Sequence, residues 1–354
     1  MSDLHSLLVN YLAEELLDEE ERNIPVKEVQ HNEDKTYGIG KSYIRTVRRP
    51  AVMEAAEKLL QTMSKQEKES LQKRGSLRGQ SAAVAVPRRV DEGALRALSP
   101  EQVTQFFRDG YLLLPDAFCE YVHLFKAEMS RLYAEGLFGN ISKSDTRKAL
   151  NLPQVTTKSR LFSSFVFSRA VRGLIADLIG SPFFLHLDQI FLKPARTGLG
   201  TAWHQDSAYY QIDNNLRGVS LWIAIDKATR ESGTLELIPG SYKQTLPHAP
   251  DPEANLLLRC YPDEAASVPC ELPPGGAVLF AYGMVHCTRN NSSANDRGSV
   301  AFHFFHSDYA KKDLLTQNTQ YRVHVEGPLS TNGVSEYNES MEHVWDLEYA
   351  KRRA

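Results

Sequence analysis

The spacing of hydrophobic positions changes along the chain. Near the N-terminus apolar residues recur every three to four positions over residues 3–22 and again over residues 50–73, which predicts two amphipathic helices. We interpret both as packing on their own core, with a partner or dimer surface as the alternative for the first. Glycine, serine and arginine residues over 74–90 predict a linker or an extended arm.

Helical signals continue from residue 99 to residue 180. Ser99, Pro100 and Gln102 have the spacing of a capping box with proline at the first helical position, and Gly110 is a stop signal. Residues 120–135 and 168–179 predict two further helices, and residues 111–114 a short buried strand. Residues 142–160 are polar and basic, which predicts a loop.

From residue 183 onwards the pattern has the period of β-strands. Strands are predicted over residues 183–193, 219–225, 233–238, 277–285 and 299–305, with glycine and proline in the turns between them. In the first of these, Gln189, Phe191 and Lys193 share one face. Many short strands without helices between them predict a mainly β fold with flanking helices and a jelly-roll core. The mouth of such a barrel suits a metal and a small ligand.

Composition excludes several classes of protein. The 354 residues are 42% apolar and 24% charged, enough for one large core or two modest ones, and the net charge of -3 gives no general attraction to nucleic acid or anionic membranes. Four cysteines without a close pair are typical of a reducing compartment, so we expect a cytoplasmic location. No run of eighteen apolar residues and no signal-peptide pattern occurs. We therefore expect an unprocessed, soluble chain that acts on a small molecule, and leave a homodimer open.

Metal chemistry is indicated by His204 and Asp206, which lie two residues apart and would share one face of a strand. A histidine and an aspartate are two members of the 2-His-1-carboxylate triad that binds non-haem Fe(II) and leaves other coordination positions open. The best candidate for the third ligand is His286, 80 residues beyond Asp206, in an apolar stretch predicted as a strand. His303 and His306 are the alternatives that the residues alone leave open.

Several separate segments resemble the phytanoyl-CoA dioxygenase family of Fe(II)- and 2-oxoglutarate-dependent oxygenases, from Leu98 to about Tyr309. They are Leu98–Gln102 with Phe106–Tyr111, Lys193-Pro194, the His204/Asp206 pair, Leu221–Asp226 with Gly233–Leu235, and His286 with Arg297-Gly298-Ser299. The resemblance implies a double-stranded β-helix of the cupin-like jelly-roll type. It also suggests three parts: a helical N-terminal extension over residues 1–95, an oxygenase core over 96–310, and a C-terminal tail over 311–354 packing on the core.

The same resemblance implies a set of site residues. In the family pattern an arginine follows the distal histidine, which favours His286 over His303 and His306 as the third ligand. Iron would be held by His204, Asp206 and His286. The co-substrate 2-oxoglutarate would be bound by Arg297 and Ser299, with Lys193 and Trp222 beside it and Gln189 as a further candidate.

The expected reaction uses O2 and 2-oxoglutarate, giving succinate, CO2 and a hydroxylated substrate. Desaturation or cyclisation at the same site is one alternative, and a non-catalytic jelly-roll binding protein is another. Substrate contacts are expected from Tyr209, Tyr210 and Gln211. Residues 142–160 and 209–215 are expected to form a lid, in which Lys158 and Arg160 favour an acidic substrate.

Overall fold

The structure is a computed structural model that describes residues 58, 61–62, 97–210, 212, 214–255, 257–310 and 322–350. The chain divides into two compact units, Met1–Arg89 and Val90–Ala354. In the first unit the described residues 58, 61 and 62 are helical. The remainder of the two expected N-terminal helices and the arm lie outside the described residues. The division at residues 95 and 310 stays a prediction.

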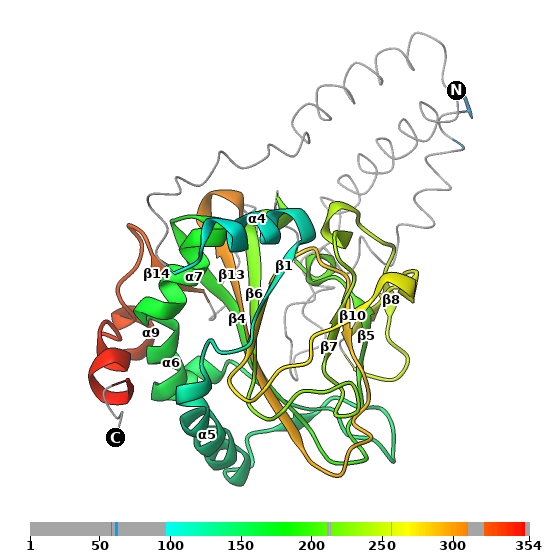
Figure 1. Ribbon diagram of the computed structural model, residues 1–354, viewed down its shortest axis with the longest axis horizontal. Helices are drawn as coiled ribbons and strands as arrows, with labels where there is room; N and C mark the ends of the chain where they lie inside the picture. Colours follow the sequence, from blue (N-terminus) through cyan, green and yellow to red (C-terminus); the bar gives the residue numbers. More distant parts are fainter. Residues whose placement is uncertain are drawn as a thin grey trace. The chain divides into compact units, whose positions relative to one another are not determined.

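A large antiparallel sheet forms the centre of the second unit (Figure 1). Its strands follow the order β1-β11-β6-β13-β4-β3-β2, and β14 pairs with one end of β4. The strands span Tyr111–Leu114 (β1), Ala277–Ala281 (β11), Gly218–Ala224 (β6), Arg297–His306 (β13), Phe183–Lys193 (β4), Leu150–Pro153 (β3), Gly139–Asn140 (β2) and Val323–Glu326 (β14).

A smaller antiparallel sheet with the order β10-β7-β12-β5 lies beside the large one (Figure 1). Its strands span Val268–Pro269 (β10), Leu235–Leu237 (β7), His286–Thr288 (β12) and Thr201–His204 (β5); a separate pair consists of Ala249–Pro250 (β8) and Leu258–Arg259 (β9). Two antiparallel sheets with helices on the outside confirm the predicted jelly roll.

The helices are α4 (Pro100–Asp109), α5 (Val122–Ala134), α6 (Arg160–Val166), α7 (Arg169–Ile179) and α9 (Val334–Tyr337). Three of them, α4, α6 and α7, begin after a serine whose hydroxyl caps the first turn. The capping box at Ser99 is confirmed, because its hydroxyl accepts from the Gln102 N–H while the Gln102 side chain accepts from the Ser99 N–H. Gly110 ends α4 at φ 82°, a conformation that glycine adopts without strain.

The two faces of the large sheet have different partners. One face packs on the helices, where Phe302 of β13 contacts Phe162 and Phe165 of α6. The other face, with Trp222 and Ala301, packs toward Leu235 and Leu237 of the small sheet. Because side chains alternate along a strand, the strands β1, β11, β6, β13 and β4 contribute to both cores.

The inner face of β4 is only half buried. Gln189 and Phe191 are partly exposed, whereas Asp188, Ile190 and Leu192 on the helical face are buried. The predicted two-faced pattern of this strand is therefore confirmed. These partly buried side chains of the inner face remain accessible to a ligand.

Two expectations from the sequence need correction. Residues 142–160 are not one loop, because Leu150–Pro153 form β3 and pair with β4, while Ser142 and Lys148 make isolated bridges to Ala254 and Gly198. The strand expected over 277–285 ends at Ala281. His286 begins a separate strand in the other sheet, because the turn at residues 282–285 carries the chain across the barrel.

The described C-terminal residues contact the same unit. β14 pairs with β4, and Trp345, in a π-helical turn (Trp345–Tyr349), packs against Phe125 and Phe165. All four cysteines are unpaired, and Cys287 is buried in a small apolar cluster. Within the described residues, helices are too short or too polar to cross a membrane.

Candidate functional site

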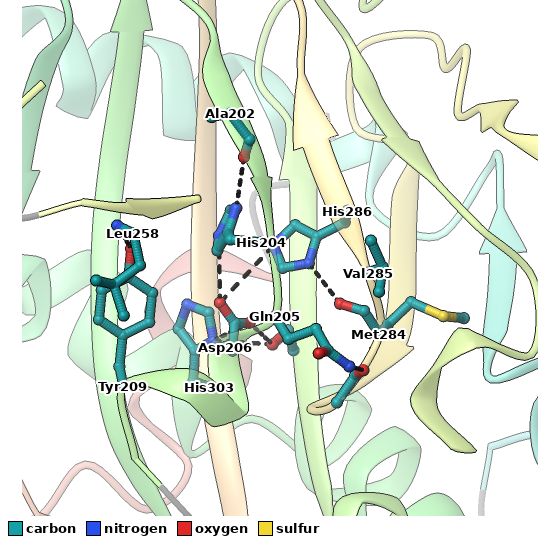
Figure 2. A network of polar contacts seen from close by, with 12 residues as sticks. Ala202, His204, Gln205, Asp206, Tyr209, Leu258, Met284, Val285, His286 and His303 are labelled. Carbon is teal, nitrogen blue, oxygen red and sulfur yellow. Dashed lines mark hydrogen bonds and ion pairs between the residues drawn. The ribbon is translucent and has the colours of Figure 1, made fainter. Parts of the chain in front are cut away.

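Three side chains converge where β5 and β12 pair (Figure 2). His204, the last residue of β5, lies directly opposite His286, the first residue of β12, and their ring centroids are 4.2 Å apart. Asp206 Oδ1 lies 3.6 Å from His204 Nε2 and 3.7 Å from His286 Nε2. Clusters of histidine, cysteine, aspartate or glutamate side chains can hold a metal ion. Among the residues described, these three form the only such cluster that is compact enough.

Asp206 reaches this position without being on the strand. β5 ends at His204, and Asp206 opens a 3-10 turn (Asp206–Ala208), so the expectation that both residues share one face of a strand was wrong in its backbone detail. The carboxylate still faces the two imidazoles, because the chain bends back immediately after the strand.

Both histidines are oriented by their own backbone. His204 Nδ1 lies 2.8 Å from the Ala202 carbonyl oxygen, and His286 Nδ1 lies 2.9 Å from that of Met284. Since a carbonyl oxygen only accepts, each Nδ1 carries the proton, and each Nε2 keeps its lone pair toward Asp206. Burial, with a smaller effect from His204, lowers the pKa of His286 to about 4, so this ring is neutral at pH 7. Neutral imidazoles with free Nε2 atoms are metal donors.

The other carboxylate oxygen of Asp206, Oδ2, is hydrogen-bonded by the large sheet. Ser220 of β6 donates to Oδ2 at 3.0 Å, and His303 Nδ1 lies 2.8 Å from the Ser220 hydroxyl and 3.4 Å from Oδ2. Burial alone would raise the pKa of Asp206, but the charge that His286 and His303 carry when protonated, together with hydrogen bonds, holds it well below its usual range. Oδ1 is thereby left for a cation, and His303 supports the triad from the neighbouring strand.

Gln205 and His248 anchor the turn between the ligands. The fully buried Gln205 side chain donates to the backbone carbonyls of Gln244 and Gly283 and accepts from the Leu246 N–H. His248 Nε2 accepts from the Gln205 N–H at 2.9 Å. None of these roles was predicted from the sequence. His248, Ser220 and His303 reach this region only through the fold, and the anchoring role of Gln205 depends on carbonyl groups of residues 244 and 283 that are distant in sequence.

Arg297 lies further along the inner face of β13 than His303. It is 1% exposed, donates to Ser299 Oγ at 2.6 Å and to the Gly233 carbonyl at 2.8 Å, and lies 5.7 Å from the ring centroid of Trp222. Its Nε has no hydrogen-bond partner, and it forms no ion pair with any described residue. Burial lowers the pKa of Arg297 to about 10, so it remains a buried cation at pH 7.

Two other expected co-substrate residues lie on the same face. Lys193 pairs with Arg297 in the β4–β13 register, and its Nζ donates to the Gly233 and Arg289 carbonyls. Burial and the charge of Arg297 hold the pKa of Lys193 well below its usual range. Gln189 lies on the inner face of β4, opposite Ala301.

The expected substrate residues are divided between two regions. Tyr209 lies against His204, with ring centroids 6.1 Å apart, and its hydroxyl accepts from the Leu258 N–H. Tyr210 packs edge-on against His186 at 4.4 Å. Both therefore lie near the triad, while Gln211 lies outside the described residues.

The structure does not bring Lys158 and Arg160 to the triad. Lys158 Nζ donates to the backbone carbonyls of Pro153 and Gln154. Arg160 opens α6 on the helical side of the large sheet, where it pairs with Glu339 and Glu348. Their charges are thus engaged elsewhere, and they support no substrate contact.

The jelly roll and the cluster of two histidines and one carboxylate at its mouth together define the class as mononuclear non-haem metal oxygenases. The sequence profile of phytanoyl-CoA dioxygenase (PhyH) matches residues 106–299, more than half of the chain. The protein belongs to the phytanoyl-CoA dioxygenase family, and it is an Fe(II)- and 2-oxoglutarate-dependent oxygenase.

Individual relatives are similar at a lower level. An ectoine dioxygenase of Stutzerimonas stutzeri (strain A1501) is 26% identical over 237 residues, covering 60% of this chain and 78% of the relative. L-proline trans-4-hydroxylase of Streptomyces griseoviridis is 29% identical over 151 residues, covering 36% and 56%. The 2-oxoglutarate-dependent carbocyclase SnoK from nogalamycin biosynthesis superposes with a TM-score of 0.53 at 20% identity, covering 66% and 95%. EctD from S. alaskensis with bound Fe superposes with a TM-score of 0.52 at 19% identity, covering 66% of this chain and 86% of EctD. These two structures confirm the fold.

Proposed function

We propose that His204, Asp206 and His286 hold Fe(II), that Arg297 and Ser299 bind the distal carboxylate of 2-oxoglutarate, and that the enzyme hydroxylates a small molecule. The observation that carries this proposal is the arrangement of the donor atoms. Two Nε2 atoms and one carboxylate oxygen face one another, while the remaining polar atoms of the three side chains are bonded to the protein. Fe(II) favours two neutral imidazoles and one carboxylate.

The co-substrate residues fit a dicarboxylate for an electrostatic reason. Arg297 is a buried cation without a carboxylate partner among the described residues, and its Nε has no acceptor. Ser299 accepts from Arg297, so the hydroxyl proton of Ser299 is free to donate to the same ligand. A carboxylate there would pair with Arg297 in surroundings from which water is excluded, where such bonds are strong.

Bound Fe(II) and 2-oxoglutarate supply the oxidation of a C–H bond by O2, with succinate and CO2 as co-products. The chain contributes position and selectivity. The backbone carbonyls of Ala202 and Met284 fix the imidazole orientations, and Ser220 with His303 keeps Asp206 ionised. Gln189 and Phe191 on the inner face of β4 are only partly buried, so their side chains are available to contact a substrate.

The test begins under argon. Purified protein is titrated with Fe(II) and then with 2-oxoglutarate, and a weak visible charge-transfer band that saturates at one equivalent of iron supports the proposal. Oxygen and a metabolite library are then added, and mass spectrometry is used to detect a product with one added oxygen together with succinate. Loss of two hydrogens would instead favour desaturation or cyclisation. Absence of the band at saturating iron would contradict the proposed cofactor site and favour a non-catalytic binding protein.

A further inference from the structure

A β-bulge turns an additional side chain into the barrel next to the triad. In the pairing of β4 with β13, His303 lies opposite Leu187, and the next residue of β13 lies opposite Leu185, so His186 is the extra residue. The His186 ring stacks on Phe305 of the inner face, with centroids 4.8 Å apart and planes 18° apart. Bulges beside active sites commonly redirect a side chain in this way.

Arg322 lies beside this bulge, immediately before the next strand. It precedes β14, whose Val323 pairs with Leu185 and packs on the helical side. By strand alternation Arg322 therefore lies on the opposite, inner side, as His324 does where it contacts the Phe184 ring. Burial lowers the pKa of His186 to about 3, and the charges of His303 and Arg322 add to this effect.

Three neighbouring strands thus carry buried nitrogen atoms that lack partners. Within the described part of the chain these are His303 Nε2 on β13, His186 Nδ1 on β4, and both Nε and Nη2 of Arg322 beside β14. His186 and His303 are each 6% exposed. An unsatisfied buried polar group is costly, so natural proteins rarely keep several together unless a ligand completes them.

The orphaned edge of Arg322 indicates the chemistry of that ligand. The Nε and Nη2 edge of an arginine binds a carboxylate side-on elsewhere in this protein. Arg108 binds Asp109 in this way at 2.8 and 2.7 Å, and Arg131 binds Glu128 at 2.9 and 2.7 Å. A planar fork with both N–H groups free matches the two oxygens of a carboxylate.

We propose that Arg322, together with His186, binds a carboxylate group of the primary substrate at the mouth of the barrel. This inference rests on the proposed function and deepens it. His303 lies between this position and Asp206, from which its Nδ1 is 3.4 Å away. Two strand spacings of about 4.8 Å separate β14 from β13, so the carboxylate would lie within roughly 10 Å of the strand that borders the triad. The substrate class is therefore a small carboxylic acid whose reacting carbon is a few bonds from its carboxylate.

The experiment uses acetate as the smallest carboxylate and acetamide as its uncharged counterpart. The full-length protein is loaded with Zn(II) and 2-oxoglutarate, which prevents turnover and occupies Arg297. Side-chain nitrogen resonances of Arg322 and His186 are assigned from their loss in Arg322→Gln and His186→Phe, and are followed by NMR during each titration. Arg160→Gln is the matched control, because it removes a cation on the other side of the sheet. Arg322→Lys, which keeps the charge but not the fork, covers the case that the glutamine variant does not fold.

We expect saturable shifts with acetate, at least tenfold weaker binding of acetamide, and at least tenfold weaker acetate binding in Arg322→Gln and Arg322→Lys. Arg160→Gln should bind acetate as the wild type does. No saturable shift with acetate, equal binding of acetamide, or unchanged binding in both Arg322 variants overturns the proposal. Phosphate binding in place of acetate overturns the carboxylate assignment. The Arg297 resonances report 2-oxoglutarate in the same samples, so failure of the proposed function is seen separately from failure of the Arg322 subsite.

Discussion

Replacing Arg297 by methionine should weaken 2-oxoglutarate binding without weakening the unliganded fold. Arg297 is buried without an ion-pair partner among the described residues, and burial lowers its pKa to about 10 from the usual 12.5. That difference corresponds to about 3 kcal/mol of unfavourable free energy for the buried charge. Methionine removes this cost and keeps much of the volume, while the Gly233 carbonyl still accepts from Lys193. We therefore expect the free energy of unfolding without ligand to rise by about 0–3 kcal/mol.

The effect on the co-substrate should have the opposite sign. Loss of a buried charge-assisted pair costs about 2–5 kcal/mol, which raises the Kd for 2-oxoglutarate by a factor of tens to thousands. Titration of the charge-transfer band under argon gives the Kd, and urea unfolding of the apo protein gives the stability.

Arg289→Met is the matched control for this variant. Arg289 pairs with the buried carboxylate of Glu236 at 2.8 Å, so its removal should destabilise the fold and leave 2-oxoglutarate affinity within about threefold. If Arg297→Met behaves like Arg289→Met, with lower stability and an unchanged Kd, Arg297 has a structural role and the assignment is wrong.

Three further predictions test other parts of the site. Asp206→Ala should abolish iron binding, measured by metal analysis after desalting, while its circular dichroism stays that of the wild type; retained iron and activity would refute the triad. Gly233→Ala should destabilise the protein by several kcal/mol more than Gly240→Ala in urea unfolding. Both glycines have a positive φ, 77° and 75°, but of the two only Gly233 has a backbone oxygen in the way, 2.1 Å from where the new Cβ would lie. Equal losses would show that the close approach relaxes. Burial lowers the pKa values of His186 and His248 to about 3 and about 4, below the unfolded value near 6.5. The unfolded chain then binds more protons at these two positions. Their contribution to apo stability should be full above pH 6.5 and be lost as the pH falls toward 4, each histidine contributing at most about 1.4 kcal/mol per pH unit. His186→Phe should remove part of that slope, and an unchanged slope would contradict the assignment.

The local signals in the sequence were sufficient for the elements around the site. The capping box at Ser99 and the stop at Gly110 define α4 because both depend on contacts within a few residues. The two-residue alternation of β4 predicted its inner and outer faces for the same reason. The family pattern named His204, Asp206, His286 and Arg297 because their chemistry limits which residue types can serve.

Only the tertiary structure decided the contacts between residues that are distant in the sequence. The direct pairing of His204 with His286, and the support of Asp206 by Ser220 and His303, depend on which strands become neighbours and in which register. No local period encodes either choice, because the strands are joined by long connections.

The cations that the sequence suggested for substrate binding illustrate the same limit. Lys158 and Arg160 were conspicuous in the sequence as charges on a polar stretch, yet the fold directs them to backbone carbonyls and to glutamates on the helical side. Arg322 gave no signal, and it lies beside His186 only because β14 pairs with β4 next to a bulge. The sequence by itself determined the barrel and the chemistry of its metal site. Which charges face the barrel depends on strand order and on a one-residue change of register, and those are set by packing of the whole sheet.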